Sequence, residues 1–232
     1  MNLLLISNST NAGEPYLQYP MAEIAQTLRG IKEIVFIPYA AVTFPYAEYE
    51  RRVQARFDEL GIRVRSIHQS PNPRMMIRHA EAICVGGGNT FALAKEMRER
   101  QLMGAIRRRI AAGGPYVGWS AGSNVACPTI STTNDMPIVQ PESFDAIGAV
   151  KFQINPHYLD ANPAGHAGET REQRILEYIE ANPRRWVVGL REGSMLRLTD
   201  EGLTLIGRPL RLFKKGEPIR ELQPGEDLSF LL

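Results

Sequence analysis

The chain has 232 residues, of which 44% are hydrophobic and 22% charged, a composition that excludes a disordered chain and favours one α/β domain over residues 1–232. A formal net charge of +2 is too small to indicate nucleic acid or a membrane surface as a partner, and two cysteines are too few for a disulfide framework or a metal site. The apolar start, residues 1–6, is too short for a signal peptide and no stretch is long enough to span a bilayer, so we expect a soluble, cytoplasmic protein.

Short apolar runs alternate with helical patterns through the first half of the chain. Strands are predicted over residues 3–6, 34–37, 62–67, 82–85 and 116–119. Helices are predicted over residues 46–60, 73–80, around 91–97 and over 104–112. This alternation predicts a mostly parallel sheet with helices on both faces, and such sheets bind ligands at the carboxyl ends of their strands.

The second half of the chain is richer in strands. A strand over residues 151–155 is expected to end at Pro156, because proline breaks the hydrogen-bonded ladder, and a buried strand spans residues 186–190. Residues 195–206 and 210–222 each contain two apolar runs separated by turn residues, which predicts two hairpins. We expect these hairpins to form an antiparallel extension of the same domain.

The most informative motif is Gly-Trp-Ser-Ala-Gly at residues 118–122, directly after an apolar strand. In this G-x-S-x-G arrangement the serine lies on a strained strand-to-helix turn, and glycines stand where a Cβ would meet the crossing backbone. The turn exposes the hydroxyl of Ser120 beside the N–H groups that begin the next helix. The motif therefore predicts a nucleophile, and the alternative is a buried serine in a glycine-rich turn.

A serine hydroxyl needs a base to become a nucleophile, and the chain has four histidines. His157 lies at a strand end beside a rigid proline turn, which suits a general base, although a backbone carbonyl is another possible partner for its ring. His166, in a glycine-rich loop, is the second candidate. His68 and His79 have no supporting context.

Two acidic residues compete for the role of orienting the base. Glu192 follows the buried strand over residues 186–190, on the side of the sheet where the site is expected. Asp135 lies in the polar segment 132–137, where it is suited to orient the histidine, bind a substrate amine or cap a turn. The spacing alone leaves both open.

An acyl-transfer site also needs donors for the oxyanion, each worth about 3 kcal/mol in the transition state. The N–H of Ala121, next after the serine, is one natural donor. The backbone of Gly86–Gly88, before a helix that begins near Asn89, is the natural second. A triple-glycine loop can also bind phosphate, but neither G-x-G-x-x-G spacing nor a Gly-Lys-Ser/Thr sequence is present here.

Arg171 is an unusual cation, because it falls in the first turn of a predicted helix. Thr170 and Gln173 match a capping box, which places the helix start here. The helix dipole disfavours a positive charge at this end, so the arginine is expected to have an anionic partner. That partner is either Glu169 or a substrate carboxylate.

Several segments together resemble the peptidase E family of aspartyl dipeptidases, and the resemblance spans nearly the whole chain. They occur in family order at residues 86–91, 118–122, 127–130, 132–139, 153–157 and 168–174. The departures are confined to surface helices and the C-terminal hairpins. The resemblance implies a flavodoxin-like three-layer sandwich, related to class I glutamine amidotransferases, that hydrolyses Asp-X dipeptides without metal or cofactor. Small peptides would be its only partners, and the expected form is a monomer or homodimer.

The resemblance also implies roles for single residues. Ser120 would be the nucleophile, His157 the base and Glu192 the orienting acid, in place of His166 and Asp135. Gly88 and Ala121 would form the oxyanion hole. The residues implied to bind substrate are Asn89, Asp135 and Arg171, with the arginine as anchor for the aspartate side chain. The remaining alternatives are a cyanophycinase-like exopeptidase and a binding protein without catalysis.

Overall fold

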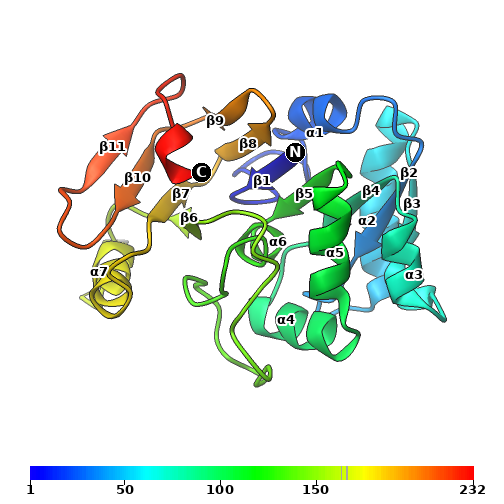
Figure 1. The fold of residues 1–232 in the computed structure, drawn as a ribbon, viewed down its shortest axis with the longest axis horizontal. Coiled ribbons are helices and arrows are strands. Elements are labelled where there is room, and N and C mark those ends of the chain that lie inside the picture. The colour runs from blue at the N-terminus through cyan, green and yellow to red at the C-terminus, as the bar shows by residue number, and fades with distance from the viewer. Residues whose placement is uncertain (163, 166) are drawn as a thin grey trace.

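The computed structural model describes residues 1–162, 164–165 and 167–232, and its strands form two sheets (Figure 1). In spatial order the central sheet contains β3 (Arg63–Ser66), β2 (Glu33–Ile37), β4 (Ala82–Val85), β5 (Tyr116–Trp119), β1 (Leu3–Ile6), β8 (Met195–Thr199) and β9 (Gly202–Ile206). The first five strands are parallel, whereas β8 and β9 are antiparallel to their neighbours. The second sheet contains β11 (Arg220–Leu222), β10 (Leu210–Phe213), β7 (Val187–Arg191) and β6 (Gln153–Tyr158).

Helices cover both faces of the central sheet, because successive strand residues point to opposite sides. On one face Leu4, Phe36 and Trp119 pack with α1 (Met21–Thr27) and α2 (Tyr46–Phe57). The other face packs against α3 (Pro73–Arg78), α4 (Thr90–Glu99) and α5 (Leu102–Ala111). The predicted fold class, a mostly parallel sheet between helices with C-terminal hairpins, is confirmed.

The second sheet is the main feature that the sequence pattern did not separate from the first. Residues of β6, β7 and β10 such as Ile154, Val188 and Leu212 belong to the same buried cluster as one face of the central sheet. The opposite face, which includes Val187, is covered by α7 (Arg171–Ala181). The two predicted hairpins therefore serve different sheets: β8–β9 extends the central one and β10–β11 the second.

Some predicted boundaries shift. The helix expected over 46–60 is α2 followed by a 3₁₀ turn (Asp58–Leu60), and another such turn (Ile67–Gln69) follows β3. The strand expected to end at Pro156 instead continues to Tyr158, with its pairing to β7 shifted after the proline. The remaining short helices are α6 (Ala121–Asn124) and a 3₁₀ turn at Ser229–Leu231.

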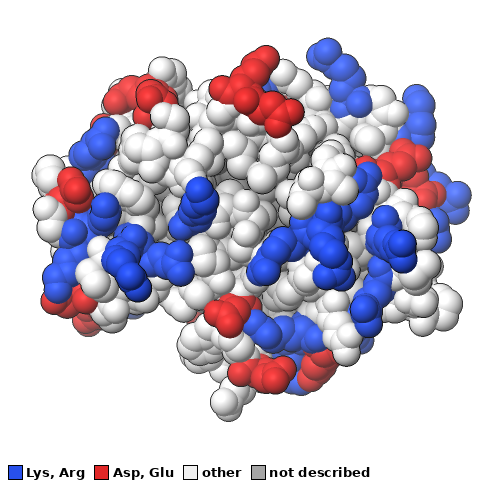
Figure 2. All heavy atoms as spheres, in the orientation of Figure 1, with Lys and Arg blue, Asp and Glu red and all other residues white. Residues whose placement is uncertain are grey.

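Basic side chains gather over α3 and α5 (Figure 2). Arg107 donates a hydrogen bond to the carbonyl of Ala146 at 3.3 Å, and Arg109 donates to the carbonyl of Ala80 at 2.7 Å. These arginines thus tie loops to α5 rather than only solvating its surface. In the described ranges, none of the helices has the length and apolar character needed to cross a bilayer.

Candidate active site

Ser120 occupies the sharp turn between β5 and α6, with φ 54° and ψ −112°. The turn is crowded: a Cβ on Gly118 would overlap the carbonyl of Gly122, and a Cβ on Gly122 would overlap the carbonyl of Val85. The glycines are therefore required by the close approach of three backbone segments. The backbone N–H of Ser120 donates to the carbonyl of Ile6 at 2.9 Å, which fixes the turn to the end of β1.

Gly122→Ala is expected to lower the free energy of unfolding by about 1–3 kcal/mol, because the added methyl group overlaps the Val85 backbone, which cannot give way cheaply. Urea denaturation measures this. Gly104→Ala is the matched control. It lies in α5, where an added Cβ would meet only the end of the Arg108 side chain, at 3.4 Å. That variant is expected to be neutral or to gain up to about 1 kcal/mol. Equal losses in both variants would contradict the steric origin of the effect.

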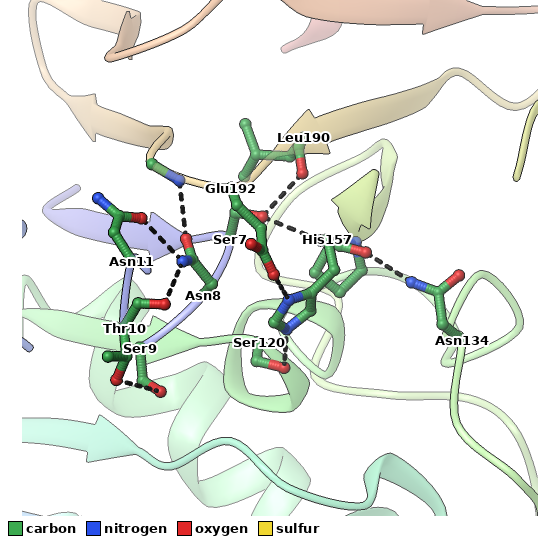
Figure 3. A network of polar contacts seen from close by, with 12 residues as sticks. Ser7, Asn8, Ser9, Thr10, Asn11, Ser120, Asn134, His157, Leu190 and Glu192 are labelled. Atoms are coloured by element: carbon green, nitrogen blue, oxygen red, sulfur yellow. Dashed lines mark hydrogen bonds and ion pairs between the residues drawn. The ribbon is translucent and has the colours of Figure 1, made fainter. Parts of the chain in front are cut away.

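The structure brings Ser120, His157 and Glu192 together in one chain of contacts (Figure 3). His157 Nε2 lies 2.8 Å from Ser120 Oγ, and His157 Nδ1 lies 2.6 Å from Glu192 Oε1. With Nδ1–H donating to the carboxylate, Nε2 is left as the acceptor for the serine hydroxyl. The arrangement has the geometry of a nucleophile, a base and an orienting acid.

His157 reaches Ser120 from a strained backbone position. Its φ is 54°, a left-handed value that is uncommon for residues other than glycine, and the pairing of β6 with β7 shifts at this point. The carbonyl just before it, that of Pro156, accepts a hydrogen bond from Asn134 Nδ2 at 2.6 Å. The second candidate base, His166, lies outside the described residues.

The Gly86–Gly88 loop lies beside the serine, since a Cβ on Gly87 would be 3.0 Å from the Cβ of Ser120. The hydroxyl of Tyr49 donates to the carbonyl of Gly87 at 2.9 Å. The trans peptide plane therefore turns the N–H of Gly88 away from Tyr49. Within the described part of the chain, neither this N–H nor that of Ala121 has a hydrogen-bond acceptor.

Asn89 and Asp135 both cap the start of α4. Asn89 Oδ1 accepts from the N–H of Ala92 at 3.0 Å, and Asn89 Nδ2 donates to the carbonyl of Met136 at 2.9 Å. Asp135 Oδ2 accepts from the N–H of Thr90 at 2.7 Å. Among the described residues, Asp135 makes no hydrogen bond or ion pair with His157, and the carboxylate beside the imidazole is that of Glu192.

Arg171 is the first residue of α7, and the predicted capping box is present. Glu169, its expected structural partner, lies 3.7 Å from Arg174 instead. Across the described ranges, no carboxylate lies within 4.0 Å of the Arg171 guanidinium. Burial, followed by the charge of Arg174, lowers the pKa of Arg171, and the nearby carboxylate of Asp135 opposes this lowering. Arg171 is therefore a half-buried cation on the Asp135 side of the site.

Several residues that hold the site had no distinct sequence signal. Tyr49 is a regularly spaced apolar residue of α2, yet its hydroxyl also accepts from Trp119 Nε1 at 3.1 Å and so links α2 to β5. Ser7 and Asn8 look like an ordinary polar loop after β1. Their position at the carboxyl end of a buried parallel strand was the one indication that they belong near a site.

The chain is similar to known peptidases over nearly its whole length. The family model of peptidase family S51 matches residues 3–206. A curated relative, peptidase E from a Nostoc species, is 50% identical over 232 residues, covering 99% of this chain and 96% of the relative. Peptidase E from Salmonella paratyphi A is 47% identical over 227 residues, covering 97% of this chain and 99% of the relative.

Solved structures show the same fold at lower identity. The crystal structure of a peptidase from an acI-B1 Actinobacterium superposes with a TM-score of 0.72 at 19% identity, covering 99% of this chain and 96% of that one. The family match contains Ser120, His157 and Glu192, and the resemblance inferred from the motifs is confirmed. The chain belongs to peptidase family S51.

Proposed function

We propose that this S51 peptidase hydrolyses dipeptides with an N-terminal aspartate, through an acyl-enzyme on Ser120. The observation that carries the proposal is the contact chain from Ser120 Oγ through His157 to Glu192, at 2.8 and 2.6 Å, on a turn that exposes the serine. A hydroxyl bonded to an imidazole that is itself oriented by a carboxylate is activated for attack on a carbonyl.

The reaction begins when Ser120 Oγ attacks the carbonyl carbon of the aspartyl residue and His157 Nε2 takes the hydroxyl proton. The carbonyl oxygen becomes an oxyanion, which the N–H groups of Gly88 and Ala121 stabilise. The C–N bond then breaks, and the leaving amine takes the proton from His157. Water attacks the resulting aspartyl ester with His157 again as base, and free aspartate and Ser120 are released.

Tyr49→Phe is expected to lower kcat by about tenfold with little change in KM, because the Gly87 carbonyl loses the donor that orients the N–H of Gly88. Tyr16→Phe is the matched control. Its hydroxyl donates to that of Tyr49 at 3.4 Å, and its removal leaves the contact from Tyr49 to Gly87 intact. Steady-state kinetics on Asp-Leu compares the two. A kcat reduced equally in both variants would show that the loss is not specific to the glycine loop.

Recognition of aspartate is assigned to Arg171, supported by its burial and by the lack of a carboxylate partner among the described residues. A guanidinium can bind both oxygens of the substrate carboxylate. Asp135 Oδ2 accepts the N–H of Thr90 at the start of α4, which leaves Oδ1 for the α-amino group of the substrate. Asn89 holds the adjoining segment through its hydrogen bond to the carbonyl of Met136. A substrate with a side-chain carboxylate and a free α-amino group would match the opposite charges of Arg171 and Asp135.

Hydrolysis of Asp-Leu, Glu-Leu, Asn-Leu and N-acetyl-Asp-Leu tests the proposal in one panel. Asp-Leu is expected to be cleaved, and each of the other three to be cleaved at least about tenfold more slowly. Asn-Leu lacks the charge that pairs with Arg171, and the acetyl group removes the charge that pairs with Asp135. Equal rates on all four peptides would contradict recognition of an N-terminal aspartate.

A further inference from the structure

The three contacting side chains come from two different sheets. Ser120 follows β5 of the central sheet, whereas His157 belongs to β6 and Glu192 follows β7 of the second sheet. A shift of about 1 Å between reacting groups can cost roughly 100-fold in rate. The reaction therefore requires that the two sheets keep a fixed position relative to each other at the site.

The residues at the end of β1 contact both sides of this junction (Figure 3). The carbonyl of Ile6 accepts the N–H of Ser120 at 2.9 Å. The next residue, Ser7, has no exposed surface, and its Oγ accepts the backbone N–H of His157 at 2.9 Å. The same hydroxyl donates to the carbonyl of Leu190 in β7 at 2.7 Å. One buried hydroxyl thus bonds β6 and β7 together.

Asn8 makes the corresponding contact to the turn that carries Glu192. Its Oδ1 accepts the N–H of Gly193 at 2.8 Å and the hydroxyl of Tyr19 at 2.7 Å. Its amide nitrogen donates to residues 10–11, so the side chain is held on both sides. Only 1% of Asn8 is exposed, and burial raises the pKa of Tyr19 with Glu192 contributing, which keeps that hydroxyl a donor.

We propose that Ser7 and Asn8 are positioning residues that align the base and the acid of the second sheet with the nucleophile of the central sheet. Among the described residues, neither side chain is hydrogen-bonded to the serine hydroxyl. Ser7 acts through the backbone of His157, whose φ of 54° persists only if its surroundings fix it. Asn8 acts through the turn at Gly193. The proposal rests on the proposed function, because it concerns the geometry of that reaction.

Ser7→Ala tests the first half of the proposal. Without the hydroxyl, the N–H of His157 and the carbonyl of Leu190 lose their partner, and the imidazole is free to move from Ser120. We expect kcat for Asp-Leu to fall about 10- to 100-fold, with KM changed by less than about twofold. The midpoint of thermal unfolding is measured in parallel.

Ser66→Ala is the matched control. Ser66 ends a strand of the same sheet, is 3% exposed, and has a hydroxyl 2.6 Å from His68 Nδ1, far along the sheet from β1. It is expected to lose stability but keep its kcat. If Ser7→Ala retains the wild-type kcat, or if Ser66→Ala loses kcat to the same extent, the positioning role is overturned.

Asn8→Ala is the second variant and keeps the proposal testable if Ser7→Ala does not fold. We expect kcat to fall about tenfold in the wild-type background. In the Glu192→Ala background, where there is no carboxylate left to position, the same change should have no further effect on kcat. Losses that multiply in the double variant would overturn the role of Asn8.

The wild-type protein separates this proposal from the function on which it rests. If wild type does not cleave Asp-Leu, the proposed function fails. If wild type cleaves Asp-Leu, and Ser7→Ala and Asn8→Ala both cleave it as fast as wild type does, only the positioning proposal fails.

Discussion

Ser120→Ala is expected to lower kcat for Asp-Leu by about 10⁴- to 10⁶-fold, since every covalent step depends on this one oxygen. Removing the hydroxyl also removes the 2.8 Å contact with His157, but it leaves the glycines and the backbone bonds of the turn unchanged. The free energy of unfolding should therefore stay within about 1 kcal/mol of wild type. The loss should appear in kcat rather than in KM, because the substrate contacts assigned to Arg171 and Asp135 remain.

Product formation followed over hours, together with an unfolding curve, checks both parts of this expectation. Ser66→Ala again serves as the control for loss of a serine hydroxyl in the same sheet, and its kcat should be that of wild type. If Ser120→Ala retains more than about a tenth of the activity, water rather than Ser120 attacks the carbonyl, and the acyl-enzyme route is wrong.

Arg171→Met is expected to lower kcat/KM for Asp-Leu by about 10²- to 10³-fold and to change Asn-Leu much less. Methionine keeps much of the side-chain volume but removes the charge and the donors that match a carboxylate. A substrate aspartate would then be desolvated without a partner, whereas a neutral asparagine loses little. The preference for aspartate over asparagine should therefore largely disappear.

Arg174→Met is the matched control for this change. It lies nearly one turn further along α7, and its Nε is 3.7 Å from Glu169 Oε2. It should alter the ratio of kcat/KM for Asp-Leu to that for Asn-Leu by less than about threefold. If Arg171→Met keeps the wild-type ratio, the anchor lies elsewhere. If Arg174→Met also lowers the preference for Asp-Leu over Asn-Leu, the preference depends on the total positive charge near the site and not on Arg171 in particular.

The local part of the site was predictable because its signals lie within a few residues of one another. The glycines at 118 and 122, after an apolar run, indicate a tight strand-to-helix turn, because a Cβ at either position would overlap the backbone. The capping box of Thr170 and Gln173, on either side of Arg171, is likewise complete within four residues. The prediction of the two C-terminal hairpins is confirmed for the same reason, since short turns join strands that are adjacent in sequence.

Other features of the site depend on which distant segments pair, and a local sequence pattern does not indicate that pairing. Strand β6 pairs with β7 and not with the central sheet, and this pairing carries the strand past Pro156 to Tyr158, with His157 at the shift in register. The partners of Ser7 at this junction are 150 and 183 residues away along the chain, and that of Asn8 is 185 residues away. A serine and an asparagine after a strand look the same in sequence whether they face water or a buried backbone group.

The sequence by itself determined the strained turn that presents Ser120, the alternation that builds a parallel sheet, and the family to which the chain belongs. The tertiary structure alone decided that the partners of Ser120 arrive from a second sheet, that Asp135 caps α4 instead of orienting the base, and that no carboxylate of the described residues lies within 4.0 Å of the Arg171 guanidinium. The reason is physical. A turn is fixed by steric contacts between neighbours, whereas hydrogen bonds and ion pairs between remote residues form only after the backbone has placed them together.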